Sequence, residues 1–462
     1  MQLTTFKTSA LAVLLVLLLG CNDRLDIERS RTVEGFVQLT SQSEVNEFAA
    51  QGYERINGTV HIGNPEGRSD IRSLSALNTI KAIDSTLLIY ENSSLFDLDG
   101  LENLVRVGDL GLFSNENLSD LSALSNLTDV GTLRIEYSQD LTSLEVFADL
   151  DTIGGDFVLI QNDLLSTLDF SSLEHVAGDV IVSGNASMTE LTWLPMLRTV
   201  GGSFGVTNHV QLPSLQGLNI QSIGESLTLI DNPLLTDLKG LESIESAGGL
   251  NIIANRQVTA IDELTILREI RGDVEISFND RVSRIEFPSL TRIDGEFSVH
   301  GMPELTDLSG FSQLQAINGY LRGLFDVPQI TDLQDLTSLT TLGGIYLIDA
   351  SLESLKGLEQ IQETELVFLY VNEHLSSMEG LDNLASVGYY FFVGANPGLQ
   401  SLQGMENLSE VLDSAIIAGN DQLTDFCALE RFVNSGTPNG LSIRSNEYNP
   451  TLQDLLDGNC QE

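Results

Sequence analysis

Positive charge is scarce in this sequence. Its 462 residues include 22 lysines and arginines against 66 aspartates and glutamates, which gives a formal net charge of −44. A surface this acidic repels phosphate groups, so nucleic acid and electrostatic docking on anionic lipid are poor candidates for partners. The acidic surface is compatible with divalent cations or a basic partner, and equally with a solvated surface that keeps the protein soluble.

Long apolar segments are also scarce, and the pronounced one lies at the amino terminus, from Leu11 to Leu19. It is too short to span a bilayer comfortably and has the form of a secretory signal. It ends in Leu18-Leu19-Gly20-Cys21, which resembles the lipobox of bacterial lipoproteins. The resemblance implies a lipid on Cys21 that anchors the chain to the bacterial cell envelope, as an outer membrane lipoprotein facing the surface or the periplasm. The alternative is an ordinary signal peptide with a chance cysteine.

Cysteine is rare as well, with three residues at positions 21, 427 and 460. An odd number is unusual in an exported protein. Assigning Cys21 to lipid leaves Cys427 and Cys460 as one pair, and an exported compartment permits a disulfide between them.

What the sequence does contain is a repeat of 23 or 24 residues with the form L-x-I-x-x-N-x-x-L-x-x-L-x-G-L-x-x-L-x-x-I-x-G. About sixteen repeats fill the chain from Ile56 to Phe426, which leaves no room for a separate catalytic domain. The asparagine column of the repeat consists of Asn92, Asn115, Asn162, Asn185, Asn232, Asn255, Asn279, Asn372, Asn396 and Asn420. Ser138, His209 and Met302 occupy this column in three further repeats, and the register slips near Val327 and Ala350.

The repeat predicts a mainly β fold, a parallel β-solenoid of about sixteen coils. In each unit the side chains at the first and third positions of a short strand point inward, because side chains alternate between the two faces of a strand. The asparagine follows where the chain leaves the strand, and its amide is expected to bond backbone groups of the turn, forming a structural ladder. The glycine before the next strand is expected to permit a tight or positive-φ turn. Because one unit cannot bury its apolar face alone, the units stack.

The segments LLIYENSSLFDL, FVLIQNDLLSTL and LTLIDNPLLTDL resemble the receptor L domain, a right-handed β-helical module related to leucine-rich repeats. Such modules occur in insulin-receptor-type ectodomains and in bacterial surface lipoproteins. This chain has far more coils and almost no cysteine, so the hormone and signalling roles of the receptors are not carried over.

Five segments are expected along the chain. They are a lipoprotein signal peptide (1–20), a lipidated tether (21–40), an N-terminal cap helix (41–55), the repeat solenoid (56–426) and a disulfide-stapled C-terminal cap (427–462). Small helical caps are expected because an open solenoid exposes the edge of its sheet.

The two caps are expected from short local patterns. Ser41 with Glu44 reads as a capping box that opens a helix and places Val45 and Phe48 over the first coil. The C-terminal cap breaks the period of the repeat, and its sequence is read as helix, strand and helix.

Reactive constellations are missing from the pattern, so no enzyme is expected. Gly201-Gly202-Ser203-Phe204-Gly205 fits a nucleophile motif, but its register makes Ser203 a turn residue and Phe204 the first inward residue of a strand. The five histidines show no paired ligand spacing, so no metal site or cofactor is expected. Calcium at the turn carboxylates of Asp97, Asp99 and Glu102 stays an alternative to simple solvation of these side chains.

An aromatic column on the outward side of the strands is the remaining candidate site. The outward position of the last coils holds Tyr346, Phe368, Phe392 and Ile416, accompanied by Tyr370, Tyr389 and Tyr390. Earlier coils carry a thinner version with Leu88, Tyr90, Phe113 and Tyr137. Such a patch marks a binding site for a protein or a polysaccharide, in adhesion or recognition. The alternative is a structural ladder in a rigid spacer or coat component.

Overall fold

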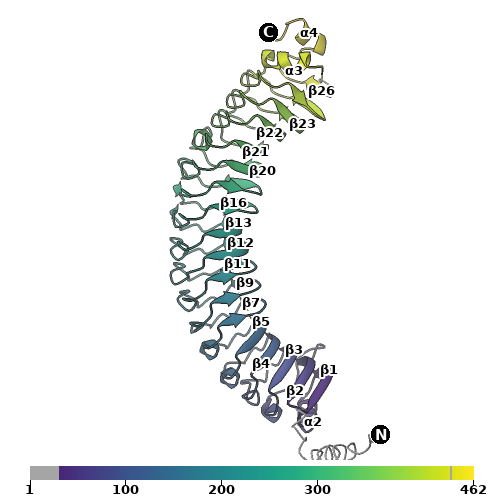
Figure 1. Cartoon of the computed structure of the whole chain (residues 1–462), viewed down its shortest axis with the longest axis vertical. Helices are drawn as coiled ribbons and strands as arrows, with labels where there is room; N and C mark the ends of the chain where they lie inside the picture. The colour runs from purple at the N-terminus through teal and green to yellow at the C-terminus, as the bar shows by residue number, and fades with distance from the viewer. Residues whose placement is uncertain (1–30, 437–439) are drawn as a thin grey trace, which may run out of the picture.

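The computed structural model describes residues 31–436 and 440–462, and they form one curved β-solenoid of about seventeen coils (Figure 1). Both ends of the arc turn toward the same side, and the strands lie along that side, so the sheet lines the concave face. This sheet has 24 strands. The predicted mainly β, parallel solenoid is confirmed.

The strands of the concave sheet fall into two groups. The main strands are β1 (Thr32–Leu39), β2 (Arg55–Ile62), β3 (Ala82–Tyr90), β4 (Arg106–Phe113), β5 (Asp129–Glu136), β7 (Phe157–Ile160), β9 (Val180–Ser183), β11 (Phe204–Thr207), β12 (Ser222–Ile230), β13 (Ser246–Ile253), β16 (Val274–Ser277), β19 (Phe297–His300), β20 (Ala316–Gly323), β21 (Thr341–Ile348), β22 (Glu363–Tyr370), β23 (Ser386–Gly394), β25 (Ser414–Ala418) and β26 (Leu441–Arg444). In some coils a short strand precedes the main one, namely β6 (Thr152–Ile153), β8 (His175–Val176), β10 (Thr199–Val200), β15 (Glu269–Ile270), β18 (Arg292–Ile293) and β24 (Glu410–Val411).

The other sides of the coils hold little regular structure. A two-stranded sheet pairs β14 (Ala260–Ile261) with β17 (Arg284–Ile285). Single 3₁₀ turns are η1 (Ser75–Leu77), η2 (Ser122–Leu124), η3 (Glu145–Phe147), η4 (Gln334–Leu336) and η5 (Cys427–Leu429). The α-helices lie near the two ends and are α2 (Gln42–Ala49), α3 (Glu430–Asn434) and α4 (Leu452–Leu456).

The core follows from alternation within each strand. In β12, Leu227 and Leu229 are fully buried, whereas Thr228 between them points outward and is half-buried. The parallel pairing with β13 sets Leu227 beside Leu250. Inward residues of neighbouring coils therefore stack into columns, and one continuous apolar core runs along the solenoid.

The last glycine of the repeat unit, which lies inside the strand in β5 and β12, has a different role from the expected one. The φ of Gly131 and of Gly224 is not positive. Instead, a Cβ at Gly224 would lie 2.0 Å from the backbone oxygen of Gly201, and a Cβ at Gly131 would lie 2.1 Å from that of Gly108. These glycines thus permit close approach between coils. Positive φ recurs instead at the glycine in the middle of the repeat unit, at +104° to +111° in six coils, and just before the asparagine column, even at a β-branched residue, Val371, with φ +58°.

The solenoid begins earlier than expected, so the prediction of a tether over residues 21–40 is wrong for residues 32–39. These residues form β1, which pairs in parallel with β2 and sets Val37 beside Val60. Val33 and Val37 pack against the core and Leu39 is buried, so apolar contact holds the strand in place. The expected count of sixteen coils omitted β1 and β26, which both belong to the concave sheet.

The N-terminal helix is shorter than the expected cap of residues 41–55. Helix α2 follows β1 and precedes β2, so it belongs to the first coil, and Figure 1 shows it at the N-terminal end of the solenoid. The Ser41 side chain accepts a hydrogen bond from the Glu44 amide at 3.3 Å, as the expected box requires. The Glu44 carboxylate, however, accepts from the backbone of Thr40 at 2.6 Å. Val45 is buried, and Phe48 packs partly against the core.

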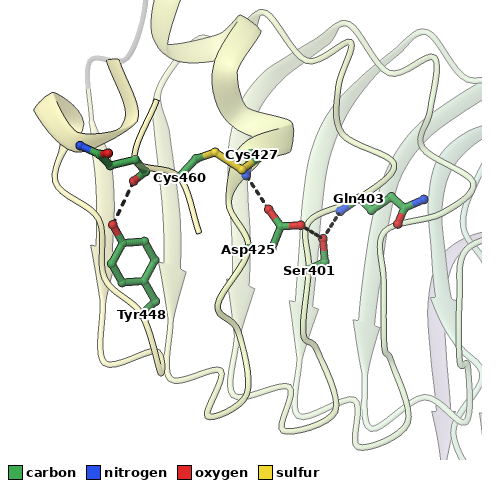
Figure 2. Close-up of a disulfide and its surroundings, with 7 residues drawn as sticks. Ser401, Gln403, Asp425, Cys427, Tyr448 and Cys460 are labelled. Carbon is green, nitrogen blue, oxygen red and sulfur yellow. Dashed lines mark hydrogen bonds between the residues drawn. A yellow bond between two sulfur atoms is a disulfide. The ribbon is translucent and has the colours of Figure 1, made fainter. Parts of the chain in front are cut away.

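The C-terminal cap has the predicted order of helix, strand and helix, with β26 paired to β25. Cys427 and Cys460 form the expected disulfide, with Cα atoms 4.9 Å apart (Figure 2). Next to it, the Asp425 carboxylate accepts hydrogen bonds from the Cys427 amide and the Ser401 hydroxyl, both at 2.9 Å. The Tyr448 hydroxyl donates to the backbone oxygen of Asn459 at 2.9 Å. The bonds of Asp425 join the start of the cap to the coil before it, and the bond of Tyr448 lies within the cap.

Candidate functional site

The asparagine column is the most regular polar feature of the molecule, and its role is structural. At Asn255, Nδ2 donates to the Leu229 oxygen of the preceding coil at 2.8 Å. Its Oδ1 accepts from the backbone amide of Asn232 at 3.2 Å and from the Asn232 Nδ2 at 3.1 Å. The bond from Nδ2 to a backbone oxygen of the preceding coil recurs at the other asparagines of the column, all buried. Oδ1 accepts a backbone amide of the preceding coil at each of them except Asn92, where it accepts from the Ser69 hydroxyl. Each amide therefore satisfies backbone groups that the turn leaves open.

The ladder extends further than sequence reasoning placed it. Asn446, in the C-terminal cap, accepts from the Asn420 amide at 3.1 Å. The segment LSIRSN from Leu441 to Asn446 carries the L-x-I-x-x-N signal, which was overlooked because the cap was read as non-repeating. Within the ladder, His209 is a buried substitute whose ring nitrogens lie 3.1 Å from the Val182 oxygen and 3.4 Å from the Asn185 oxygen. Burial lowers the pKa of His209, so the ring is neutral at neutral pH.

The aromatic column on the concave face is a stack of parallel rings. Tyr346, Phe368 and Phe392 occupy one register on β21, β22 and β23. Their ring centroids are 4.8 Å apart at both steps, with interplanar angles of 12° and 16°. At the end of the stack formed by Tyr346, the Arg322 guanidinium carbon lies 4.9 Å from the centroid of the Tyr346 ring. Ring faces are therefore covered by their neighbours, and the half-buried rings present mainly their edges to solvent.

Two tyrosines beside this stack have rings that remain accessible to solvent. Tyr370 is 40% exposed and is tilted by 52° to Phe392 at 6.0 Å. Tyr389 is 64% exposed. Tyr390, by contrast, stacks on Phe392 with an interplanar angle of 13°, and Ile416 is half-buried in the next strand. The concave face near the C-terminal end therefore offers two accessible rings beside a packed column.

The N-terminal aromatic group is larger than expected. Tyr90 lies 6.1 Å from His61, which in turn lies 4.9 Å from Phe36. Phe36 was missed because β1 was assigned to the tether, whereas His61, in β2, was considered only as a metal ligand. Phe113 pairs in register with Tyr90, whereas Leu88 pairs with Gly111. Tyr137 lies beyond the end of β5, at a positive-φ position.

A cavity of about 440 Å³ opens on the outward side of β19, β20 and β21. Its lining includes Ser298, His300, Arg322, Phe325, Tyr346 and Asp349. Ser298, Arg322 and Tyr346 stand in one outward register, so the cavity continues directly into the aromatic column. Sequence reasoning registered the slip of the repeat near Val327 but did not derive a cavity from it.

The motifs considered for chemistry have structural roles. Phe204 begins β11 and is fully buried, while the Ser203 hydroxyl donates to the Glu225 carboxylate at 3.3 Å. The Asp97 carboxylate accepts from the Asp99 amide at 3.1 Å, and the Glu102 carboxylate accepts from Gly100 at 2.9 Å. The negative charge of Asp97 raises the pKa of Asp99. Within residues 31–436 and 440–462, no group of three or more His, Cys, Asp or Glu side chains is arranged to hold a metal ion.

Comparison of the chain with protein-family models and with curated proteins found no match. Cys21, where the lipid is expected, lies outside the described residues. Among the helices that the structure describes, none combines the length and hydropathy needed to cross a bilayer.

Proposed function

We propose that this protein is a non-catalytic recognition protein, anchored to the bacterial cell envelope by lipid on Cys21, which binds a protein partner through its concave sheet face. The observation that carries the proposal is the pair of accessible rings, Tyr370 and Tyr389, beside the half-buried column of Tyr346, Phe368 and Phe392. Aromatic side chains at the centre of an apolar patch are frequent energetic anchors of protein interfaces. A rigid concave sheet holds such anchors in fixed positions, which lowers the entropic cost of binding.

The orientation of the rings favours a protein over a polysaccharide. A sugar ring stacks on the face of an aromatic ring, whereas the rings of the column turn their faces toward one another at 4.8 Å. What remains accessible is a row of ring edges and the flank of Tyr370. Ring edges carry partial positive charge and pack well against aliphatic side chains, carbonyl oxygens and other rings. These are the groups that a protein surface supplies.

A rigid spacer is the second candidate, and the stack itself favours it. Each stacked aromatic pair contributes about 0.5 to 1.5 kcal/mol beyond the burial of its area. The column would therefore stiffen the coils from β21 to β23 without any ligand. The two functions differ in one expectation, because a spacer has no use for exposed rings such as Tyr370 and Tyr389.

The test uses the full chain as bait for cell-surface and extracellular protein of the source organism, followed by a binding measurement with each purified candidate partner. The test variant is Tyr370→Ser/Tyr389→Ser, which leaves the stacked rings in place. The matched control is Phe96→Ser, which removes a ring that is 58% exposed and lies in a turn outside the strands.

The proposal expects a purified partner to bind the native chain and Phe96→Ser equally, and the double variant at least tenfold more weakly. Equal binding by all three chains would place the site elsewhere. If no partner binds the native chain, the spacer becomes the better explanation. A parallel series with and without calcium shows whether the turn carboxylates assist binding.

A further inference from the structure

The cavity beside the aromatic column results from a break in the repeat. Gly323 of β20 has φ +81° and stands in register with the buried Val299 of β19, while buried Leu324 follows it. A Cβ on Gly323 would lie 2.9 Å from the Ser298 hydroxyl and 3.3 Å from the His300 ring. The glycine therefore keeps open a space that a side chain would fill. Its volume lies within the range typical of small binding sites.

The charges at the cavity are unequal. The Arg322 guanidinium donates to the Glu296 carboxylate at 2.5 Å and lies over the Tyr346 ring, so its charge and one of its faces are already engaged. The Asp349 carboxylate, in contrast, is exposed and makes no hydrogen bond or ion pair within the described residues. Burial lowers the pKa of His300, so this ring adds no positive charge at neutral pH. The uncompensated charge at the cavity is thus negative.

Two further features are suited to a cation. The Phe325 ring lines the cavity and is stacked on His300 with centroids 4.2 Å apart, which leaves its opposite face uncovered by that ring. The electron-rich face of an aromatic ring attracts a cation. His300 is nine-tenths buried, and its Nδ1 has no hydrogen-bond partner within the described residues. In the tautomer that carries its proton on Nε2, the nitrogen that lies 3.9 Å from the Glu275 carboxylate, Nδ1 can accept a hydrogen bond from an ammonium or guanidinium group.

We propose that this cavity receives the side chain of an arginine or lysine from a basic segment of the protein partner. The inference rests on the function proposed above and names the chemistry of the partner. The free carboxylate of Asp349 pairs with the cation, Phe325 supplies a ring, and the formal net charge of −44 draws basic segments to the surface. An anionic ligand would have to displace Glu296 from Arg322 and enter a strongly negative field.

The experiment measures the affinity of fluorescently labelled hexa-arginine for the full chain by fluorescence anisotropy, in about 150 mM salt to screen long-range attraction. The test variant is Asp349→Asn. The matched control is Asp231→Asn, because Asp231 occupies the same turn position, directly before the asparagine column, with a similar positive φ and an exposed side chain. Both variants remove one negative charge, so their difference isolates the local contribution of the cavity.

We expect Asp349→Asn to weaken hexa-arginine binding about fivefold, as for a partly exposed ion pair, and Asp231→Asn to change it by less than about 1.5-fold. Phe325→Leu, which keeps an apolar side chain of similar size, should weaken binding about threefold. Equal losses in the two aspartate variants, or no loss in either, would mean that the peptide senses the general negative field, and the cavity proposal would be wrong. Preferential binding of labelled hexa-glutamate would also overturn it.

The two proposals fail separately. If Asp349→Asn shows its specific loss while the Tyr370→Ser/Tyr389→Ser variant binds partners normally, the cavity is a cation site and the aromatic anchors are wrong. If the tyrosine variant loses its partner while Asp349→Asn behaves like Asp231→Asn, the recognition face stands and the cavity has no part in it.

Discussion

Replacing Asn255 by alanine tests whether the asparagine ladder holds the coils together. Asn255 is fully buried in the middle of an uninterrupted run from Asn232 to Asn279. The change removes four bonds of the side chain, to the Leu229 and Ile253 oxygens at 2.8 and 3.1 Å and to the amide and side chain of Asn232 at 3.2 and 3.1 Å. Each bond contributes about 0.5 to 1.5 kcal/mol and a backbone amide is left buried without a partner, so we expect a loss of at least about 3 kcal/mol.

Hydrogen exchange is the suitable measurement, because a solenoid opens locally and a single unfolding free energy is poorly defined for it. Amides of residues 227–235 and 250–258 should lose protection by about two orders of magnitude, which corresponds to about 3 kcal/mol. The control is Asn251→Ala in the same strand, where the half-buried side chain donates a single bond to Thr228 at 3.3 Å. Its effect should stay below about 0.5 kcal/mol. A loss under threefold in Asn255→Ala, or equal losses in the two variants, would refute the reasoning.

Three further changes test other parts of the fold. Burial raises the pKa of Glu263 in the folded chain. The protonated side chain therefore favours folding at low pH, and this contribution is lost as the pH rises through the raised pKa. The thermal midpoint of Glu263→Gln, relative to that of the native chain, should increase between about pH 5 and about pH 7.5. Val371→Gly should raise the free energy of local opening of its coil, measured by hydrogen exchange, by about 0.5 to 1 kcal/mol. The reason is that φ +58° strains a β-branched residue more than glycine. A lower free energy of opening would mean that the Val371 side chain contributes more than the strain costs. Reduction of the disulfide between Cys427 and Cys460 should cost the C-terminal cap about 3 kcal/mol, so limited proteolysis should cut within residues 427–462 before any other part, and cleavage at an unchanged rate would contradict this.

Much of the fold could be predicted from the sequence because the inward positions and the asparagine column repeat with one period. Leu227, Leu229 and Asn232 are buried, as the alternation and the turn position require. The first strand escaped prediction for a physical reason. It carries apolar residues at alternating positions, Val33, Val37 and Leu39, but Gly35 interrupts the alternation and no asparagine follows the strand. The signal of the repeat is therefore absent where the solenoid begins.

The cavity was beyond sequence reasoning for a related reason. A period identifies the coil in which the register changes, and the slip near Val327 does so here. The period of the repeat does not show whether the additional residue points into the core or toward solvent. Its direction depends on the positive φ of Gly323 and on the burial of Leu324, and both result from packing between coils. The His300 ring stacks on Phe325 only because of this local rearrangement.

Stacking between coils also determines which outward aromatic residues remain accessible. Adjacent strands bring equivalent side chains to about 4.8 Å, so aromatic rings repeated in one register stack face to face and cover each other's faces. Side chains are accessible to solvent where a glycine takes the place of an aromatic or other large residue in the register. Tyr370 stands in register with Gly394, tilts over Phe392 and stays exposed, and the cavity opens where Gly323 displaces the chain of β20. In a solenoid of this kind, the regular columns stabilise the coils, and the interruptions beside them are the places where we propose that a partner makes contact.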